Sequence, residues 1–162
     1  MFDRETEELA TSVLAACRER GWHVATAESC TGGLVAAALT AITGSSDVVD
    51  RGFVTYSNEA KMELLGVSST TLDAHGAVSA ETALAMASGA VARAGVDLAV
   101  SIAGVAGPGG GSAEKPVGLM HFGVATRSGG HTERRIFPGD RTEIRRAAMV
   151  FALDLLLAEA RG

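Results

Sequence analysis

Apolar residues recur at two spacings along the chain, and this pattern predicts alternating helices and strands. Leu9, Val13 and Cys17 lie four positions apart, which predicts a helix over about residues 3–20 that ends at Gly21. Five short runs of apolar and β-branched residues predict strands over about 22–27, 48–56, 97–103, 117–126 and 131–137. Further helices are predicted over about 34–42, 58–65 and 69–74, from the cap Ser79 to Gly95, and from the cap Asp140 onward.

Two segments between these elements are predicted to lack regular structure. Residues 104–116 are dense in glycine and proline, which excludes a helix or a strand. The glycines follow neither the spacing of an ATP phosphate loop nor that of a dinucleotide-binding turn. This loop can wrap a ligand with its backbone N–H groups or serve as a plain connector. Ser128-Gly129-Gly130 indicates the turn of a hairpin between the last two strands.

Helices between and after the strands, with one hairpin, predict an α/β fold: a three-layer α/β/α sandwich with a mixed β-sheet. The 162 residues are the size of one domain, which we expect to span 1–162. Hydrophobic residues make up 47% of the chain and aromatic residues only 4%, beside 20 glycines. The interior is therefore expected to consist of Ala, Val and Leu with close backbone contacts.

Charge and composition restrict the partners. The formal net charge of -5 gives no basic excess, so nucleic acid is not expected as a partner. The acidic N-terminal sequence is unlike a signal peptide, and the apolar runs are too short to span a membrane, so a cytoplasmic location is expected. Cys17 and Cys30 are expected to be reduced thiols, and no metal-ligand spacing occurs.

The sequence from Thr26 to Gly33 places Ser29 at the junction between a predicted strand and a predicted helix. The start of a helix has unpaired N–H groups that can hold an anion or an oxygen that gains negative charge. Glycines at positions 32 and 33 allow a ligand to approach the backbone closely. The alternative is that Ser29 or Thr31 only caps the helix.

Six ordered motifs carry a family resemblance over nearly the whole chain: residues 27–33 (AESCTGG), 44–46 (GSS), 51–61 (RGFVTYSNEAK), 75–79 (HGAVS), 104–108 (GVAGP) and 115–118 (KPVG). Together they resemble the CinA C-terminal domain family, whose stand-alone members are nicotinamide mononucleotide (NMN) deamidases. The resemblance implies hydrolysis of the carboxamide of NMN to nicotinic acid mononucleotide and ammonia by a serine–lysine mechanism. It implies neither a metal nor a cofactor.

Amide hydrolysis requires a nucleophile, a base and donors for the oxyanion. Ser29 is the expected nucleophile and Lys61 the expected base. A free lysine titrates near 10.4 and a helix dipole disfavours a cation by only ~0.3–1 kcal/mol, so Lys61 is expected in a closed pocket. Cys30 is expected in the core, whereas Ser46 remains a rival nucleophile or a second hydroxyl in a proton relay.

Further site residues are expected around this pair. Tyr56 is placed with the catalytic group, because it can stack on a pyridine ring or donate a hydrogen bond. Glu28 has no assigned role, and Arg145 and Arg146 are expected on a solvated helix face. Substrate contacts are predicted for Thr31, Gly32, Gly33, Asn58, Gly104, Gly107 and Arg141, with Arg141 facing the phosphate.

Two classes of function remain open. The first is an NMN amidohydrolase, which we expect to form a homo-oligomer, namely a dimer. The second is a nucleotide-binding or competence-associated interaction module without turnover. Release of ammonia from NMN distinguishes them.

Overall fold

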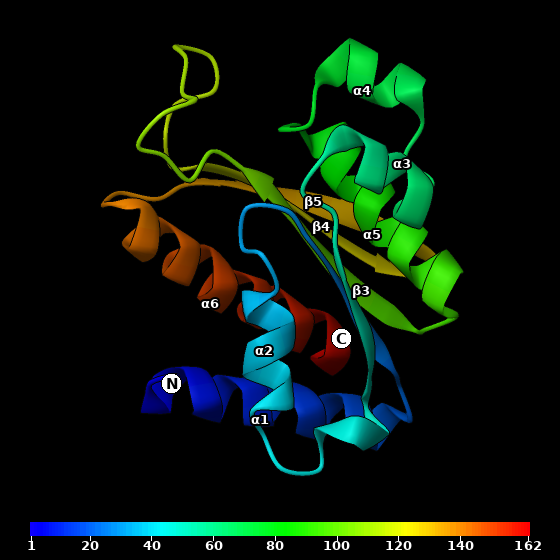
Figure 1. Ribbon diagram of the computed structural model, residues 1–162. Coiled ribbons are helices and arrows are strands. Elements are labelled where there is room, and N and C mark those ends of the chain that lie inside the picture. The colour runs from blue at the N-terminus through cyan, green and yellow to red at the C-terminus, as the bar shows by residue number, and fades with distance from the viewer.

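The computed structural model describes residues 1–162 and contains one five-stranded mixed sheet (Figure 1). The strand order is β2-β1-β3-β4-β5. β1 pairs in parallel with β2 and with β3, whereas the β3–β4 and β4–β5 pairs are antiparallel. The strands are β1 (Val24–Glu28), β2 (Val49–Val54), β3 (Leu98–Gly104), β4 (Leu119–Thr126) and β5 (Gly129–Ile136).

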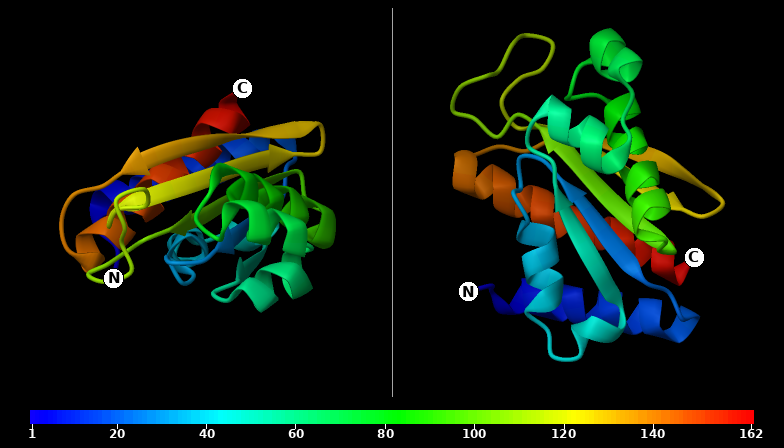
Figure 2. Two further views of the ribbon diagram at one scale, coloured as in Figure 1. Left: turned by 90° about the horizontal axis from the view of Figure 1, so that it is seen from above. Right: turned by 45° about the vertical axis from the view of Figure 1, so that its right-hand side comes forward.

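Helices cover both faces of the sheet, which confirms the predicted three-layer α/β/α sandwich (Figure 2). α1, α2 and α6 lie on one side, and α5 lies on the other with α3 and α4 beside it. None of the helices is both long enough and apolar enough to cross a membrane. Their bounds are α1 (Arg4–Arg20), α2 (Leu34–Thr40), the 3-10 turn η1 (Ser45–Asp47), α3 (Asn58–Leu65), α4 (Ser69–His75), α5 (Ala80–Ala94) and α6 (Arg141–Arg161).

The two faces of the sheet carry side chains of different size. On β3, Leu98, Val100 and Ile102 belong to the core cluster that also holds residues of α1, α2 and α6. Ala99 and Ala103 of the same strand belong to the second cluster, with residues of α5. The small side chains let α5 lie close to the sheet, as the alanine- and glycine-rich composition predicts.

A glycine on α5 sets the position of α3. A Cβ atom at Gly89 would lie 1.9 Å from the carbonyl oxygen of Leu65, the last residue of α3. No side chain fits at this position, so α3 packs directly on the backbone of α5. Because α3 begins at Asn58, this contact also fixes where the first turn of α3 lies relative to the sheet.

The hairpin differs from its prediction by two residues. β4 ends at Thr126 and β5 begins at Gly129, so the turn is Arg127–Ser128 rather than residues 128–130. Gly130 is paired with Ala125 inside the ladder, and a Cβ atom there would lie 2.9 Å from a methyl carbon of Leu84. Gly130 therefore serves the packing of α5 against the strand and not the turn.

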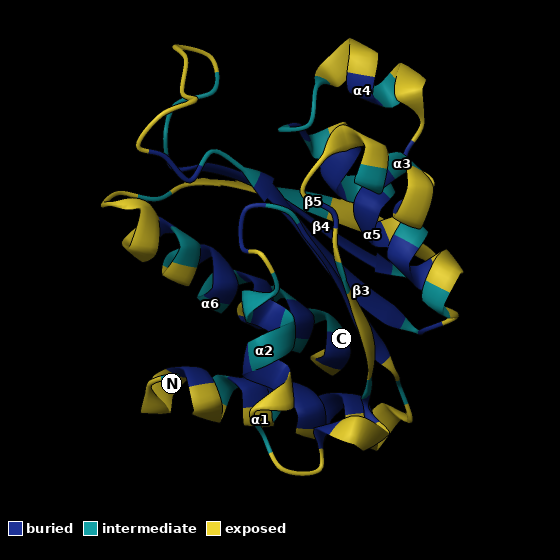
Figure 3. Ribbon diagram, viewed as in Figure 1, coloured by how far each residue is buried: buried dark blue, intermediate teal, exposed yellow.

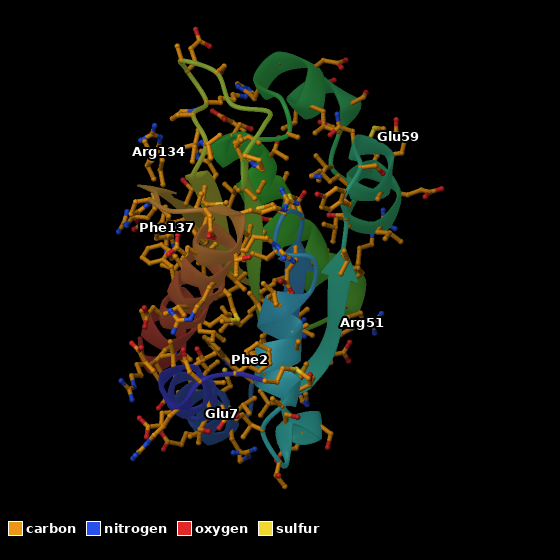
Figure 4. The ribbon with its side chains drawn as sticks, turned by 60° about the vertical axis from the view of Figure 1, so that its left-hand side comes forward. Phe2, Glu7, Arg51, Glu59, Arg134 and Phe137 are labelled. Atoms are coloured by element: carbon orange, nitrogen blue, oxygen red, sulfur yellow. The ribbon has the colours of Figure 1, made fainter.

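The edges of the sheet are exposed, whereas its centre is buried (Figure 3). β1 is buried along its whole length, but the four residues 50–52 and 54 of β2 are exposed. Arg51 lies on the outer side of β2 in Figure 4, where its guanidinium contacts Asp50. β2 is thus held mainly by its ladder with β1 and by the segment that follows it.

Candidate active site

The side chains of Ser29 and Lys61 meet beyond the carboxyl ends of β1 and β2. Lys61 Nζ lies 3.3 Å from Ser29 Oγ and donates a hydrogen bond of 2.8 Å to the carbonyl oxygen of Thr55. Ser29 directly follows β1, and Lys61 lies in the first turn of α3, which follows β2. Because β1 and β2 are parallel neighbours, their ends bring together residues that are 32 positions apart.

Lys61 is buried, as expected for an amine that must be uncharged near neutral pH. Only 1% of its surface is exposed, and it is among the largest fully buried side chains of the protein. Burial lowers the pKa of the Lys61 amine below its usual value of 10.5, against a smaller opposing effect of Cys30. A neutral amine has a lone pair that can accept the hydroxyl proton of Ser29 while one N–H stays bonded to Thr55.

The turn from Ser29 to Gly33 is fixed on one side by the buried carboxylate of Glu28. Glu28 Oε1 accepts from Thr31 Oγ1 at 2.8 Å and from the N–H of Val35 at 3.0 Å. Glu28 Oε2 accepts from Thr26 Oγ1 and from the N–H of Ala36, each at 3.1 Å. Glu28 is fully buried, so it caps α2 from the preceding strand, in place of Gly33, which has no side chain to do so.

Three backbone N–H groups in this turn have no partner in the protein. The N–H of Ser29 donates to Ile102 and that of Gly32 donates to the carbonyl oxygen of Ser29. The N–H groups of Cys30, Thr31 and Gly33 donate to no atom of the protein, and Thr31 is fully buried, which leaves those of Cys30 and Gly33 for a ligand. Gly32 and Gly33 both adopt positive φ values, 59° and 103°, which turn the chain sharply before α2.

Thr31 differs from its predicted role. Its side chain is fully buried and donates its hydroxyl proton to Glu28, so it is not a hydroxyl that faces a ligand. Thr31 as a whole has no exposed surface, so its backbone N–H group is not open to a ligand either.

α6 contacts the other side of the turn through a residue that the sequence analysis placed on a solvated face. Arg145 is half-buried, and its Nε donates to the carbonyl oxygen of Cys30 at 3.0 Å and its Nη2 to that of Thr31 at 3.3 Å. The expectation for Arg145 was therefore wrong. Arg146 is exposed as expected, but its partner is Asp3 of the N-terminal segment.

Three of the predicted residues are connected by the guanidinium of Arg141. Its Nη1 donates to the carbonyl oxygen of Gly107 at 2.7 Å, and its Nη2 to the hydroxyl of Tyr56 at 3.3 Å. Tyr56 is 64% exposed and Arg141 is exposed, so both can be reached by a ligand. A pocket beside Arg141 is lined by Ala106, Pro108, Val117, Gly139, Asp140, Arg141 and Thr142.

The glycine-rich segment between β3 and β4 has two anchors. Arg141 binds the carbonyl oxygen of Gly107, and Lys115 Nζ donates to the carbonyl oxygen of His75 at the end of α4 at 2.9 Å. Figure 1 shows this segment beyond the same end of the sheet as the turn at Ser29. It therefore borders the site from the side of α4 and α6.

Ser46 lies at the wrong end of the sheet for the role predicted for it. It belongs to η1, which comes just before β2, and Val24 and Val49 pair at that end. Ser29 follows the opposite end of β1, and a strand of this length spans about 16 Å. Ser46 is also exposed, so neither attack nor a proton relay with Lys61 is possible from this position.

In the structure, neither Asn58 nor Gly104 has a feature that indicates substrate contact. Asn58 is the exposed first residue of α3. A Cβ atom at Gly104 would lie 2.1 Å from Met120 Sδ, so glycine is needed there for β3 to pack beside β4. The prediction of a ligand contact at Gly104 has this simpler explanation.

Cys30 does not compete with Ser29. It is buried, its Sγ lies 3.5 Å from Met120 Sδ, and burial raises the pKa of its thiol to about 11, against the opposing charges of Arg145 and Arg141. A thiol with this pKa is protonated near neutral pH and is a poor nucleophile. The expectation of a core cysteine agrees with this position.

The fold and the site define an α/β/α domain in which a serine after one strand faces a buried lysine after the neighbouring strand. Backbone N–H groups and arginine side chains lie beside this pair. The sequence model of the CinA C-terminal domain matches residues 6–160, and the chain belongs to this family.

The similar proteins are named either as nicotinamide-nucleotide amidohydrolases or as competence proteins. The chain is 52% identical over 160 residues to the nicotinamide-nucleotide amidohydrolase PncC of Enterobacter agglomerans, covering 98% of each chain. PncC of Escherichia coli strain K12 is 53% identical over 157 residues, covering 96% of this chain and 95% of PncC. The crystal structure of the competence/damage inducible protein CihA from Agrobacterium tumefaciens matches with a TM-score of 0.94 and 52% identity, covering 98% of this chain and 97% of that one.

Proposed function

We propose that this protein hydrolyses the carboxamide of NMN with water, giving nicotinic acid mononucleotide and ammonia. The class of enzyme, an amidohydrolase acting on a nicotinamide nucleotide, follows from relatives that match over nearly the whole chain. The observation that supports the mechanism is the distance of 3.3 Å between Ser29 Oγ and the amine of a lysine that is 1% exposed.

In the first half of the reaction Ser29 attacks the carboxamide carbon while its proton passes to the neutral amine of Lys61. The carbonyl oxygen of the substrate becomes an oxyanion, for which the unbonded N–H groups of Cys30 and Gly33 are the candidate donors in the turn. The C–N bond then breaks, and the leaving nitrogen takes the proton from Lys61 and departs as ammonia. An ester between Ser29 and the nicotinoyl group remains.

In the second half a water molecule attacks this ester. Lys61 accepts a proton from the water and returns it to Ser29 Oγ as the ester bond breaks, so the acid is released and both side chains regain their starting states. Lys61 serves as base in each attack and as acid in each departure. No other titratable side chain is needed for this cycle.

The phosphate and the ring of the substrate are assigned to the group around Arg141. A guanidinium binds a phosphate with two parallel hydrogen bonds, and Arg141 is exposed beside Tyr56 and Gly107. Tyr56 offers an exposed ring and hydroxyl to the substrate. Gly32 and Gly33 leave the backbone of the turn open to the carboxamide.

Ammonia release from NMN, with the acid identified by chromatography, tests this function directly. Ser29→Ala and Lys61→Ala are each expected to lower kcat at least ~1000-fold, and the double variant little further, because residues that act as a unit are not additive. Ser128→Ala, in the hairpin at the far end of the sheet, is the matched serine control and is expected to keep the parent kcat.

Two results would oppose the proposal. A Ser29→Ala enzyme with the parent rate would remove the nucleophile. Purified protein that binds NMN but releases no ammonia over a wide pH range would favour the interaction module instead. The predicted dimer stays a prediction, which sedimentation velocity tests.

A further inference from the structure

Arg145 forms a bridge between α6 and the turn that carries Ser29. Its planar guanidinium donates through two nitrogens to two successive carbonyl oxygens, those of Cys30 and Thr31. These bonds connect residues at least 114 positions apart in the chain. The side chain is half-buried, so solvent competes for these bonds less than it would on an exposed helix face.

The peptide group between Cys30 and Thr31 has no other partner in the protein. Its carbonyl oxygen accepts only from Arg145, and its N–H, that of Thr31, is one of the three unbonded N–H groups of the turn. The next peptide group, between Thr31 and Gly32, has two hydrogen bonds besides the one from Arg145. The carbonyl oxygen of Thr31 also accepts from the N–H of Leu34, and the N–H of Gly32 donates to the carbonyl oxygen of Ser29. Only the Cys30–Thr31 group therefore depends on Arg145 for its orientation.

A planar trans peptide directs its C=O and its N–H to opposite sides. A guanidinium that holds the carbonyl oxygen of Cys30 therefore directs the N–H of Thr31 away from α6. We propose that Arg145 is a positioning residue, which fixes the Cys30–Thr31 peptide group and thereby the turn that carries Ser29 for its attack on the carboxamide. This inference rests on the proposed function.

The two arginines of α6 thus have separate tasks. Arg141 is exposed and contacts Tyr56 and Gly107 at the place assigned to the phosphate, whereas Arg145, one helical turn later, contacts the nucleophile turn. Arg146 provides a matched control, because it is the next residue on the same helix, is exposed, and contacts only Asp3 and Glu5. Arg145→Met removes both bonds, whereas Arg145→Lys retains the charge but not the planar pair of donors.

The test compares kcat and KM of Arg145→Met, Arg145→Lys and Arg146→Met with NMN and with nicotinamide riboside, which has no phosphate. A displacement of a reacting group by about 1 Å can cost ~100-fold in rate, so a fall in kcat of at least ~10-fold is expected for Arg145→Met. KM should change less than ~3-fold, and kcat should fall by the same factor with both substrates, since the phosphate is not involved. Arg145→Lys should lie between Arg145→Met and the parent, and Arg146→Met should match the parent.

Two kinetic results would overturn the inference. One is a kcat of Arg145→Met within twofold of that of Arg146→Met. The other is a rise in KM for NMN alone with kcat unchanged, which would make Arg145 a phosphate ligand.

A readout without turnover separates this inference from the proposed function. In ¹H–¹⁵N spectra the Thr31 amide signal is expected to shift or broaden in Arg145→Met and to stay in place in Arg146→Met. If the parent and Arg146→Met release no ammonia, the proposed function fails, and the positioning of the Thr31 amide is still decided by these spectra. An unchanged Thr31 signal in Arg145→Met would overturn it.

Discussion

The amine of Lys61 donates to the carbonyl oxygen of Thr55 at 2.8 Å, six residues earlier in the chain. Thr55 follows β2 and is joined to β1 by a bond from its N–H to the carbonyl oxygen of Glu28. The same short segment therefore binds the strand that precedes Ser29 and the amine that faces Ser29. A backbone carbonyl of this segment therefore fixes the position of the Lys61 amine relative to Ser29 Oγ.

The first prediction concerns the pH dependence of catalysis. Because burial lowers the pKa of Lys61, kcat/KM for NMN is expected to rise with pH and to level off below pH 10.5. Lys61→Arg keeps a charged side chain at every pH and is expected to lose activity across the range. A rate that does not depend on pH between 6 and 10 would argue against Lys61 as the base.

The second prediction concerns the effect of Lys61 on stability. The folded state binds fewer protons than the unfolded state between the lowered pKa and 10.5, so the free energy of unfolding rises with pH in this window and falls as pH decreases. Lys61→Met is expected to remove this slope in urea titrations between pH 7.5 and 10. Lys115→Met, which changes the second of the two lysines, is the control and should keep the slope.

The third prediction concerns the buried carboxylate of Glu28. Glu28→Gln replaces an acceptor oxygen with an NH₂ group and leaves at least one buried N–H of α2 without a partner. We expect a loss of about 2–4 kcal/mol in the free energy of unfolding, measured with urea. Glu59→Gln, at an exposed position of α3, should change it by less than ~0.5 kcal/mol. Equal effects of the two changes would show that Glu28 does not hold the turn.

The fourth prediction uses the contact between α5 and α3. In Gly89→Ala the new methyl group meets the carbonyl oxygen of Leu65, so α3 must shift and Lys61 must move with it. Overpacking of this kind costs about 1–3 kcal/mol, and kcat is expected to fall at least ~10-fold in protein that is still folded. Ser88→Ala, at an exposed position of the same helix, is the control. Gly95→Ala is unsuitable because Gly95 has a positive φ. Full activity of folded Gly89→Ala would show that α3 tolerates the displacement.

The fifth prediction separates substrate binding from chemistry at Arg141. Arg141→Ala is expected to raise KM for NMN at least ~10-fold and to have little effect on nicotinamide riboside, because only NMN has the phosphate. Steady-state kinetics with both substrates measures this. A similar change in KM for the two substrates would assign Arg141 to the ring or the ribose.

Much of the architecture could be predicted from the sequence because it follows from local patterns. The strand before Ser29 and the helix start near Lys61 are marked by β-branched residues and by cap residues. Their parallel pairing then brings the two side chains together. The burial of Lys61 could be inferred from the energy needed to make its amine neutral.

The errors concern contacts between distant segments. The sequence near Arg145 is typical of a solvated helix, and nothing local shows that α6 crosses the turn at Cys30 and Thr31. Ser46 lies in a polar turn two residues after Gly44, but which end of the sheet it occupies depends on the direction of β2. Glu28 could have been found from its position before a helix whose own cap, Gly33, has no side chain.

The exposed edge strand β2 links the proposed Ser29–Lys61 pair to a weakly protected part of the sheet. Its residues are mostly open to solvent, and edge strands of this kind open at lower free energy than central ones. Detachment of β2 from β1 would carry Thr55 and the start of α3 away while β1, β3 and β4 remain folded. Activity should therefore be lost at a lower denaturant concentration than the one that unfolds the core. Detachment of this single strand would be enough to inactivate the enzyme.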